Sequence, residues 1–182
     1  TYTDKENKLV HPFQTSWGST TRMIGGIIMT HGDDNGLVLP PAVAPIQAVI
    51  IPVSMHKEGV LEAASALCDR LKAAGIRVKL DDSDNSPGWK YSEYEMKGVP
   101  LRIEIGPRDI ESAQCVMVTR HNREKTFVPL DALEETAKER LHAVRDGLYA
   151  NALANRDRRS YDCHNLDEVK AARDQIVRYT FA

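Results

Sequence analysis

The chain has 182 residues, of which 42% are hydrophobic and 27% are charged. This length suits one ordinary domain plus a shorter segment, and the composition is typical of a soluble globular protein, which excludes a disordered, a collagen-like or a membrane-spanning chain. Lysine and arginine number 24, and aspartate and glutamate 26, so the formal net charge is -2. Because this charge gives no general attraction to nucleic acids, any RNA contact has to come from a local patch, and we expect no DNA or membrane partner.

The three cysteines, Cys68, Cys115 and Cys163, are far apart and match neither a disulfide framework nor a zinc-finger spacing. This pattern favours a reducing, cytoplasmic compartment and predicts no metal site. The chain begins at Thr1, without an initiating methionine and without the apolar stretch of a secretory signal. We therefore expect a fragment of a longer cytoplasmic protein.

The N-terminal part predicts a strand at residues 11–17, an apolar helix at about residues 20–30, and then a turn and a proline-rich exit. Gly25 and Gly26 each cost the helix on the order of 1 kcal/mol, so we expect this segment to pack closely against another backbone, a partner that is absent from this chain. Because prolines cannot continue a helix, we place a domain boundary near Pro45.

From residue 46 the pattern changes to alternating strands and helices. The predicted elements are strand, helix, strand, helix, strand, closing hairpin and long helix, at residues 46–53, 60–74, 76–80, 89–97, 101–105, 115–128 and 133–148. A strand, helix, strand order requires a right-handed crossover between parallel strands. The fold class is therefore α/β, with a mixed sheet of about five strands flanked by about three helices and preceded by a strand-helix remnant of another domain.

The last part of the chain becomes polar after Asn151, which predicts a connector and then a further amphipathic helix at about residues 166–176. The whole chain then divides into a first domain remnant at 1–45, an α/β domain at 46–155, and a connector with the start of an extension at 156–182.

The first segment with a chemical signature is Gln-Thr-Ser-Trp-Gly-Ser-Thr-Thr-Arg at residues 14–22. A strand followed by a helix with Arg22 in its first turn places a permanent cation where several helix N–H groups also point, which suits a nucleotide. From the pattern alone, pairing of Arg22 with a surface carboxylate is the simpler interpretation.

A second signature follows the helix at residues 89–97. Along the strand at residues 101–105, alternate aliphatic side chains face the core and Arg102 faces the other way. Glu95 ends the preceding helix, and a short connection returns the chain, so we expect Glu95 to lie near Arg102 and form an ion pair.

Three residues of that helix, Lys90, Tyr94 and Lys97, recur at helical spacing. Because residues three and four positions apart share one face of a helix, an aromatic ring is expected between two cations. Such a face suits a phosphate backbone and an unstacked base.

These two segments also resemble a known family. Residues 14–26, continuing through the turn to Pro45, resemble motif 3 of a class II aminoacyl-tRNA synthetase, specifically a prolyl-tRNA synthetase of the archaeal and eukaryotic type. Residues 86–109 resemble the anticodon-binding domain of the same family, and the whole resemblance covers about residues 11–155. It implies a parent enzyme, expected to be a homodimer, that joins proline to proline tRNA with ATP and Mg²⁺. The fragment alone is expected to be inactive, because motifs 1 and 2 are not found in it.

The resemblance also implies roles for the first segment. Arg22 matches the motif 3 arginine that stacks on the adenine of ATP, and Thr20 matches a threonine beside the same nucleotide. Ser16, Trp17 and Gly18 match the strand that lines the proline pocket.

The genetic code gives the second segment its expected ligand. Proline codons begin with two cytosines, so proline anticodons offer guanine at their second and third positions. Guanine has donors at N1 and N2 and acceptors at O6 and N7, so a reader needs a carboxylate and an arginine or lysine. The resemblance implies that Glu95 and Arg102 are the first candidates and Lys97 and Arg108 the next, and Lys90 is a further expected tRNA contact. The competing interpretation is a solvated Glu95–Arg102 ion pair that contributes about 0–1 kcal/mol.

Two other functions stay open. One is the anticodon domain of another class IIa synthetase, for threonine, histidine or glycine, against which the guanine-reading set and the Thr-Ser-Trp-Gly sequence at residues 15–18 argue. The other is a non-catalytic interaction module of the same fold. Such a module would keep its partner binding after loss of Arg102.

Overall fold

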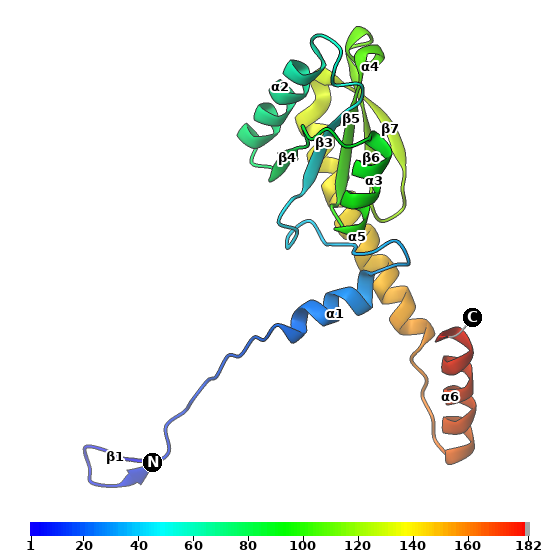
Figure 1. Cartoon of the computed structure of the whole chain (residues 1–182). Coiled ribbons are helices and arrows are strands. Elements are labelled where there is room, and N and C mark those ends of the chain that lie inside the picture. Colours follow the sequence, from blue (N-terminus) through cyan, green and yellow to red (C-terminus); the bar gives the residue numbers. More distant parts are fainter. Residues whose placement is uncertain (181–182) are drawn as a thin grey trace.

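The computed structural model describes the backbone of residues 1–180 and the side chains of residues 1–173. Its centre is a five-stranded sheet in the order β4-β3-β5-β6-β7 (Figure 1). The strands are β3 (Ala48–Pro52), β4 (Val78–Leu80), β5 (Leu101–Ile105), β6 (Gln114–Thr119) and β7 (Lys125–Pro129). β3 pairs in parallel with β4 and β5, whereas β5, β6 and β7 pair antiparallel. The predicted α/β fold with a mixed sheet is confirmed.

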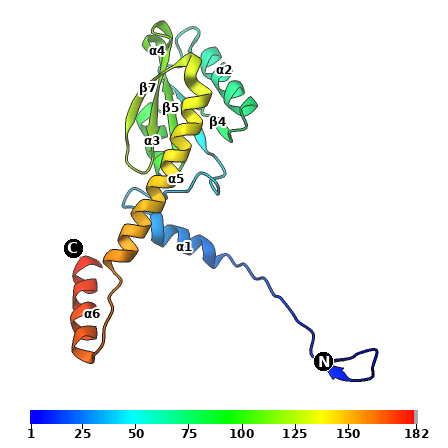
Figure 2. The ribbon, with the colours of Figure 1, turned by 180° about the vertical axis from the view of Figure 1, so that it is seen from behind.

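Helices cover the two faces of the sheet unequally. They are α2 (Val60–Ala73), α3 (Pro87–Met96), the short α4 (Pro107–Glu111), the 3-10 turn η1 (Leu130–Ala132) and α5 (Leu133–Arg158). α2 and α5 pack on one face over the larger core, and α3 packs on the other face against β3 (Figures 1 and 2). On the α3 face, Val118 of β6 is buried, whereas Phe127 of β7 is exposed.

Local sequence explains where these elements begin and end. All five residues of β3 are buried, as expected for a central strand covered on both faces. Gly75 follows α2 in a left-handed conformation, with a φ of 83°, which glycine adopts without a steric penalty. The hydroxyl of Ser86 accepts a hydrogen bond from the Trp89 N–H at the start of α3, and Pro87 occupies its first turn.

The N-terminal part differs from the prediction. It forms two short strands, β1 (Tyr2–Thr3) and β2 (Leu9–Val10), and the helix α1 (Arg22–His31). The strand predicted at residues 11–17 is wrong, because a strand needs a hydrogen-bonding neighbour and the described chain places none beside this segment. No atom lies within 4 Å of a Cβ placed at Gly25 or Gly26, so neither glycine packs closely against another segment of the described chain.

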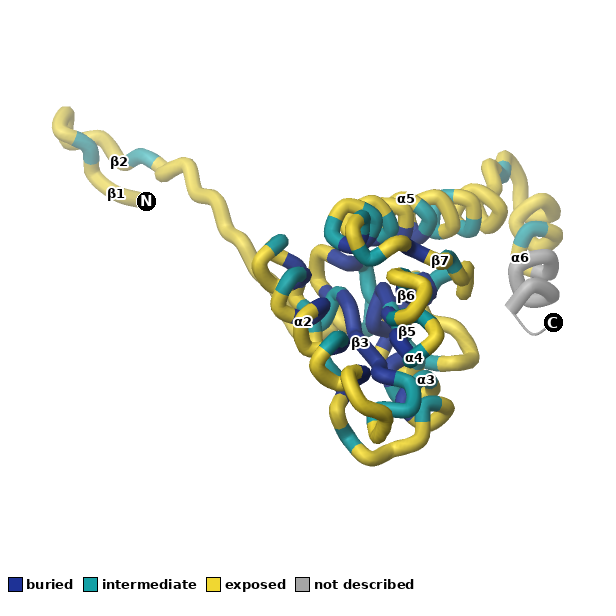
Figure 3. Tube along the Cα trace, turned by 90° about the horizontal axis from the view of Figure 1, so that it is seen from above, coloured by how far each residue is buried: buried dark blue, intermediate teal, exposed yellow. Residues whose placement is uncertain are grey.

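The C-terminal part also differs. α5 runs without interruption to Arg158, into the segment predicted as a connector, and its continuous helix therefore passes the proposed boundary at residue 155. The predicted last helix is present as α6 (Leu166–Thr180). Buried residues gather in the sheet and on the helix sides that face it, whereas the N-terminal segment and the described part of α6 are mostly exposed (Figure 3).

Two further findings concern the described part of the chain. No helix within residues 1–180 combines the length and hydrophobicity that crossing a bilayer requires. Over the same part, no group of three or more His, Cys, Asp or Glu side chains is placed so that it could hold a metal ion.

Backbone contacts join the segment after α1 to the end of α3. The Leu37 N–H donates to the Met96 carbonyl at 2.9 Å, and the Leu39 N–H donates to the Gly98 carbonyl at 3.2 Å. Glycines make this approach feasible. A Cβ at Gly98, which has a φ of 71°, would lie 2.7 Å from the Leu37 backbone, and Gly36 meets Met96 equally closely.

We therefore expect Gly98→Ala to lower the free energy of unfolding by about 1–3 kcal/mol, because the new methyl group meets backbone and a left-handed conformation disfavours alanine. The control is Gly88→Ala in α3, where no atom lies within 4 Å of the added Cβ and no left-handed conformation is required. Urea unfolding followed by circular dichroism measures both. Equal stability of the two variants would contradict the backbone contact.

Candidate nucleic-acid interface

A pocket of about 150 Å³ opens on the α3 face of the sheet. Its lining combines the end of α3 with β3, β5, β6, β7 and the β6–β7 turn, and consists of Val49, Tyr94, Glu95, Val99, Arg102, Val118, Thr119, Arg120, Arg123 and Lys125. One row of cross-strand neighbours forms its floor, namely Val49, Arg102, Val118 and Lys125 on β3, β5, β6 and β7. The sheet register therefore brings separate charged side chains to one place.

Glu95 and Arg102 both line this pocket, but they do not pair with each other. Glu95 lies 2.9 Å from the Nε of Arg123, and Arg102 lies 2.9 Å from Glu104. The expected Glu95–Arg102 ion pair is wrong, because each finds a nearer partner. The Oε1 of Glu95 is buried and accepts no hydrogen bond, since the Arg123 contact is close without being aligned as one. The carboxylate is thus held at the pocket by its ion pair with Arg123.

Arg102 is held in place from two sides. Its Nε donates to the Oε1 of Glu104 at 2.9 Å, and its guanidinium carbon lies 4.2 Å from the ring centre of Tyr91. Burial and the nearby Glu104 carboxylate raise the pKa of Tyr91 to about 12, so this ring stays neutral. Among the described residues, the terminal NH₂ groups of Arg102 donate no hydrogen bond, which leaves them for a ligand.

Lys90, Tyr94 and Lys97 do not form the exposed face that was predicted on α3. Tyr94 is buried, and the ammonium groups near its ring are Lys79 at 5.6 Å and Lys97 at 5.7 Å. Lys90 is only 1% exposed, and its Nζ donates to the Asp81 carbonyl at 2.9 Å. Lys90 is therefore a structural residue and not an RNA contact, because its position on α3 faces the loop that follows β4.

Arg108 is exposed but lies apart from this pocket. It lines a second hollow at the end of β5, together with Ser54, Lys57 and Asp109. Asp109 accepts a hydrogen bond from the Gly106 N–H at 2.8 Å and so caps α4.

Sequence reasoning missed Arg123 and Lys125 as pocket residues. Both belong to the predicted β6–β7 hairpin, so a signal existed, namely two cations near a turn at alternate positions. Which strand neighbour Lys125 faces depends on the register of β7 against β6, and the sequence does not fix it.

The predicted nucleotide and proline residues lie in the N-terminal segment, away from the pocket. Arg22 begins α1, as predicted, and the hydroxyl of Thr20 accepts a hydrogen bond from the Arg22 N–H at 3.3 Å. Arg22 pairs with no carboxylate in the described chain, so the simpler interpretation of this residue is not observed. Ser16, Trp17 and Gly18 are exposed.

The region that contains this pocket also matches a known protein family. The family model described as "Anticodon binding domain" matches residues 47–140, which include the whole sheet and the pocket. The chain belongs to the anticodon-binding domain family.

Three relatives of this chain share the name "Proline--tRNA ligase". The chain is 61% identical to a "Proline--tRNA ligase" of Ruminiclostridium cellulolyticum over 98% of its residues, and 57% identical to one of Clostridium botulinum strain 657 over 93%. A "Proline--tRNA ligase" of Lachnospira eligens is 54% identical over 93% of the chain. The chain spans 36%, 35% and 35% of these relatives, respectively. The resemblance to prolyl-tRNA synthetases is confirmed over nearly all residues, while the archaeal and eukaryotic type stays a prediction.

The buried side chain of Arg120 holds two other segments of the chain beside the pocket. Arg120 donates from Nη1 and Nη2 to the two Asp33 oxygens at 2.7 and 2.6 Å, and from Nε to the Glu95 carbonyl at 2.9 Å. It thereby connects the turn after α1 to Glu95 on α3. The next residue, His121, packs on α5, where a Cβ at Gly147 would lie 2.7 Å from its Nε2.

The Arg120–Asp33 pair predicts a pH dependence. The hydrogen bond from Arg120 lowers the pKa of Asp33 from its ordinary value of 3.8 to about 2. Since the pKa is depressed in the fold, the pair contributes fully above about pH 4 and loses its contribution as the pH falls toward 2. We expect Asp33→Asn to be less stable than the original chain, with a difference that narrows across this range.

Thermal unfolding at several pH values measures that difference. The control is Asp34→Asn, because Asp34 forms no ion pair in the described part of the chain. A stability loss of Asp33→Asn that does not change with pH would show that the ionised pair is not its source.

Proposed function

We propose that this chain is the anticodon-reading part of a prolyl-tRNA synthetase, and that its α3-face pocket holds guanine of the proline anticodon. The observation that carries the proposal is the convergence of one carboxylate, Glu95, and three cations, Arg102, Arg123 and Lys125, around one pocket. The family match and the names of the relatives support the same conclusion.

The chemistry of guanine matches this arrangement. Glu95 accepts from the N1 and N2 donors of a guanine, and the terminal NH₂ groups of Arg102 donate to O6 and N7 of a base. Tyr91 and Glu104 hold Arg102 in one orientation, which lowers the entropy lost on binding. Arg123 and Lys125 add donors for the second guanine.

Two further cations are assigned to the RNA backbone. Lys97 is half exposed beside the pocket, and Arg108 is exposed at the end of β5. Phosphate contacts of this kind position an RNA without reading its sequence.

The first segment is proposed to serve the parent enzyme. Arg22 and Thr20 would contact ATP, and Ser16, Trp17 and Gly18 would line the proline pocket once the rest of that domain surrounds them. The proposed division is a catalytic remnant at 1–45, the anticodon-binding domain at 46–155, and a connector with the start of an extension at 156–182.

The parent is proposed to be a cytoplasmic homodimer that uses ATP with Mg²⁺ to join proline to its tRNA. The described residues hold no acidic cluster that fits a metal ion, so this chain is not proposed to bind the Mg²⁺. The relatives' names favour proline over threonine, histidine and glycine as the amino acid.

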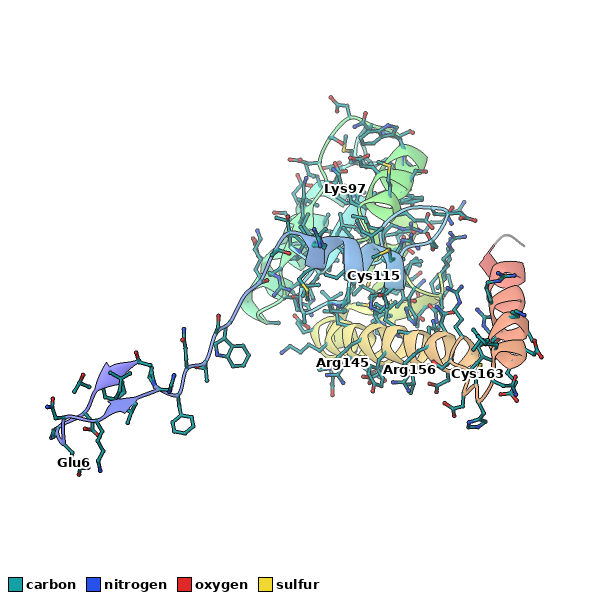
Figure 4. All side chains as sticks on the ribbon, turned by 90° about the horizontal axis from the view of Figure 1, so that it is seen from below. Glu6, Lys97, Cys115, Arg145, Arg156 and Cys163 are labelled. Carbon is teal, nitrogen blue, oxygen red and sulfur yellow. The ribbon has the colours of Figure 1, made fainter. Side chains whose placement is uncertain are left out.

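We expect Arg102→Ala to weaken binding of a proline-tRNA anticodon stem-loop by about 1–3 kcal/mol, because it removes the donors to one guanine edge. Calorimetric titration measures this change. The control is Arg145→Ala on α5, which lies on the far side of the sheet from Lys97 (Figure 4). Unchanged affinity of Arg102→Ala would favour the interaction-module alternative.

We expect Arg22→Ala in the full-length enzyme to reduce proline-dependent ATP–pyrophosphate exchange by about 100-fold or more, because it removes a cation that stabilises the bound triphosphate. Exchange does not require tRNA, so the assay separates this role from anticodon reading, and Arg145→Ala again serves as the control. Normal exchange by Arg22→Ala would show that motif 3 is misassigned.

A further inference from the structure

Phe127 is a large aromatic side chain left in the open on β7. It is 66% exposed, and it belongs to neither of the two cores that pack on the sheet. Leaving a phenylalanine in water forgoes the free energy that its burial would provide. An exposed ring beside a charged pocket therefore calls for an explanation.

The sheet register fixes which way Phe127 faces. It pairs with Val116 of β6, which pairs with Glu104 of β5, which pairs with Ile51 of β3. Ile51 packs under α3, so this whole row lies on the α3 face. Phe127 thus stands on the same face as the pocket, one row along from its floor.

Its charged neighbours on this face are of both signs, with Glu104 in its own row and paired with Arg102. Lys125, two residues earlier on the same strand, shares the face of Phe127 and lines the pocket, and Arg102 lies in the same row as Lys125. Half-buried Val116 lies beside the ring. An exposed ring beside a lysine on the surface of a sheet is an arrangement that binds unpaired bases by stacking.

The genetic code says what such a ring could hold. Proline codons share their first two letters and differ in the third, so the first anticodon nucleotide varies while the other two are guanine. A site for the variable nucleotide has to bind every base, and stacking does so because every base has a π face, whereas hydrogen bonding to base edges discriminates.

We propose that Phe127 stacks on the variable first nucleotide of the anticodon, next to the guanines in the pocket. This inference rests on the proposed function. It assigns affinity without sequence preference to Phe127, and sequence preference to the pocket residues.

The test titrates the chain with four proline anticodon stem-loops that differ only at the first anticodon nucleotide. Phe127→Ala is expected to weaken binding to all four by a similar factor, about tenfold, because one stacking contact is lost. Phe127→Tyr and Phe127→Trp are expected to keep the affinity. Phe13→Ala is the matched control, because Phe13 is fully exposed in the N-terminal segment.

A fifth stem-loop, abasic at that nucleotide, tests the contact directly. The unchanged chain is expected to bind it about tenfold more weakly, and Phe127→Ala is expected to show no further loss on it. Additive losses would overturn the contact, as would equal affinities of Phe127→Ala and the unchanged chain for all four loops.

The same titrations separate this inference from the proposed function. If the unchanged chain prefers loops with both guanines over loops in which one is replaced by adenine, but Phe127→Ala has no effect, only the stacking assignment fails. If the unchanged chain shows no such preference, anticodon reading itself fails.

Discussion

The position of the candidate reader depends on the guanidinium of Arg120. Its side chain is 3% exposed, and a buried cation is tolerated only where its donors are satisfied. Arg120 meets this requirement through Asp33 and the Glu95 carbonyl, which come from the turn after α1 and from the end of α3. Three segments that are distant in sequence are thereby held together at one point of the β6–β7 turn.

This arrangement separates support from recognition within a single hairpin. Arg120 is turned inward and fixes the backbone of Glu95, while Arg123, three residues later, reaches the Glu95 side chain. The backbone of the proposed reader is thus rigid, and its carboxylate oxygen still lacks a hydrogen bond. Pre-organisation of this kind improves binding because less conformational freedom is lost when the ligand arrives.

The sheet could be predicted from sequence because its strands are bounded by strong local signals. Buried aliphatic runs, Gly75 and the Ser86-Pro87 start of α3 all confirm the predicted order. The strand at residues 11–17 could not be judged in the same way, since a strand is defined by its neighbours as well as by its own residues. Local pattern therefore predicts elements whose partners lie within the same α/β unit.

Charged residues were harder to place than apolar ones. Glu95 and Arg102 were predicted to approach one another, and both reach the pocket, but each pairs elsewhere because long side chains select the nearest partner in three dimensions. Lys90 shows the opposite error, since helical spacing placed it on a face without indicating that the loop after β4 would cover that face. Assignments that depend on register or on a covering loop need the folded chain.

The β6–β7 turn also limits how this domain can change in length. Loop tips are usually the sites where extra residues are accommodated most readily. Here Arg120 is anchored to two other segments, and His121 fits against a helix at a glycine. An insertion between these residues and Arg123 would shift one arginine relative to the other. Circular permutation or tagging at this hairpin should therefore be far less successful than at the polar loop of residues 82–85, which is largely exposed.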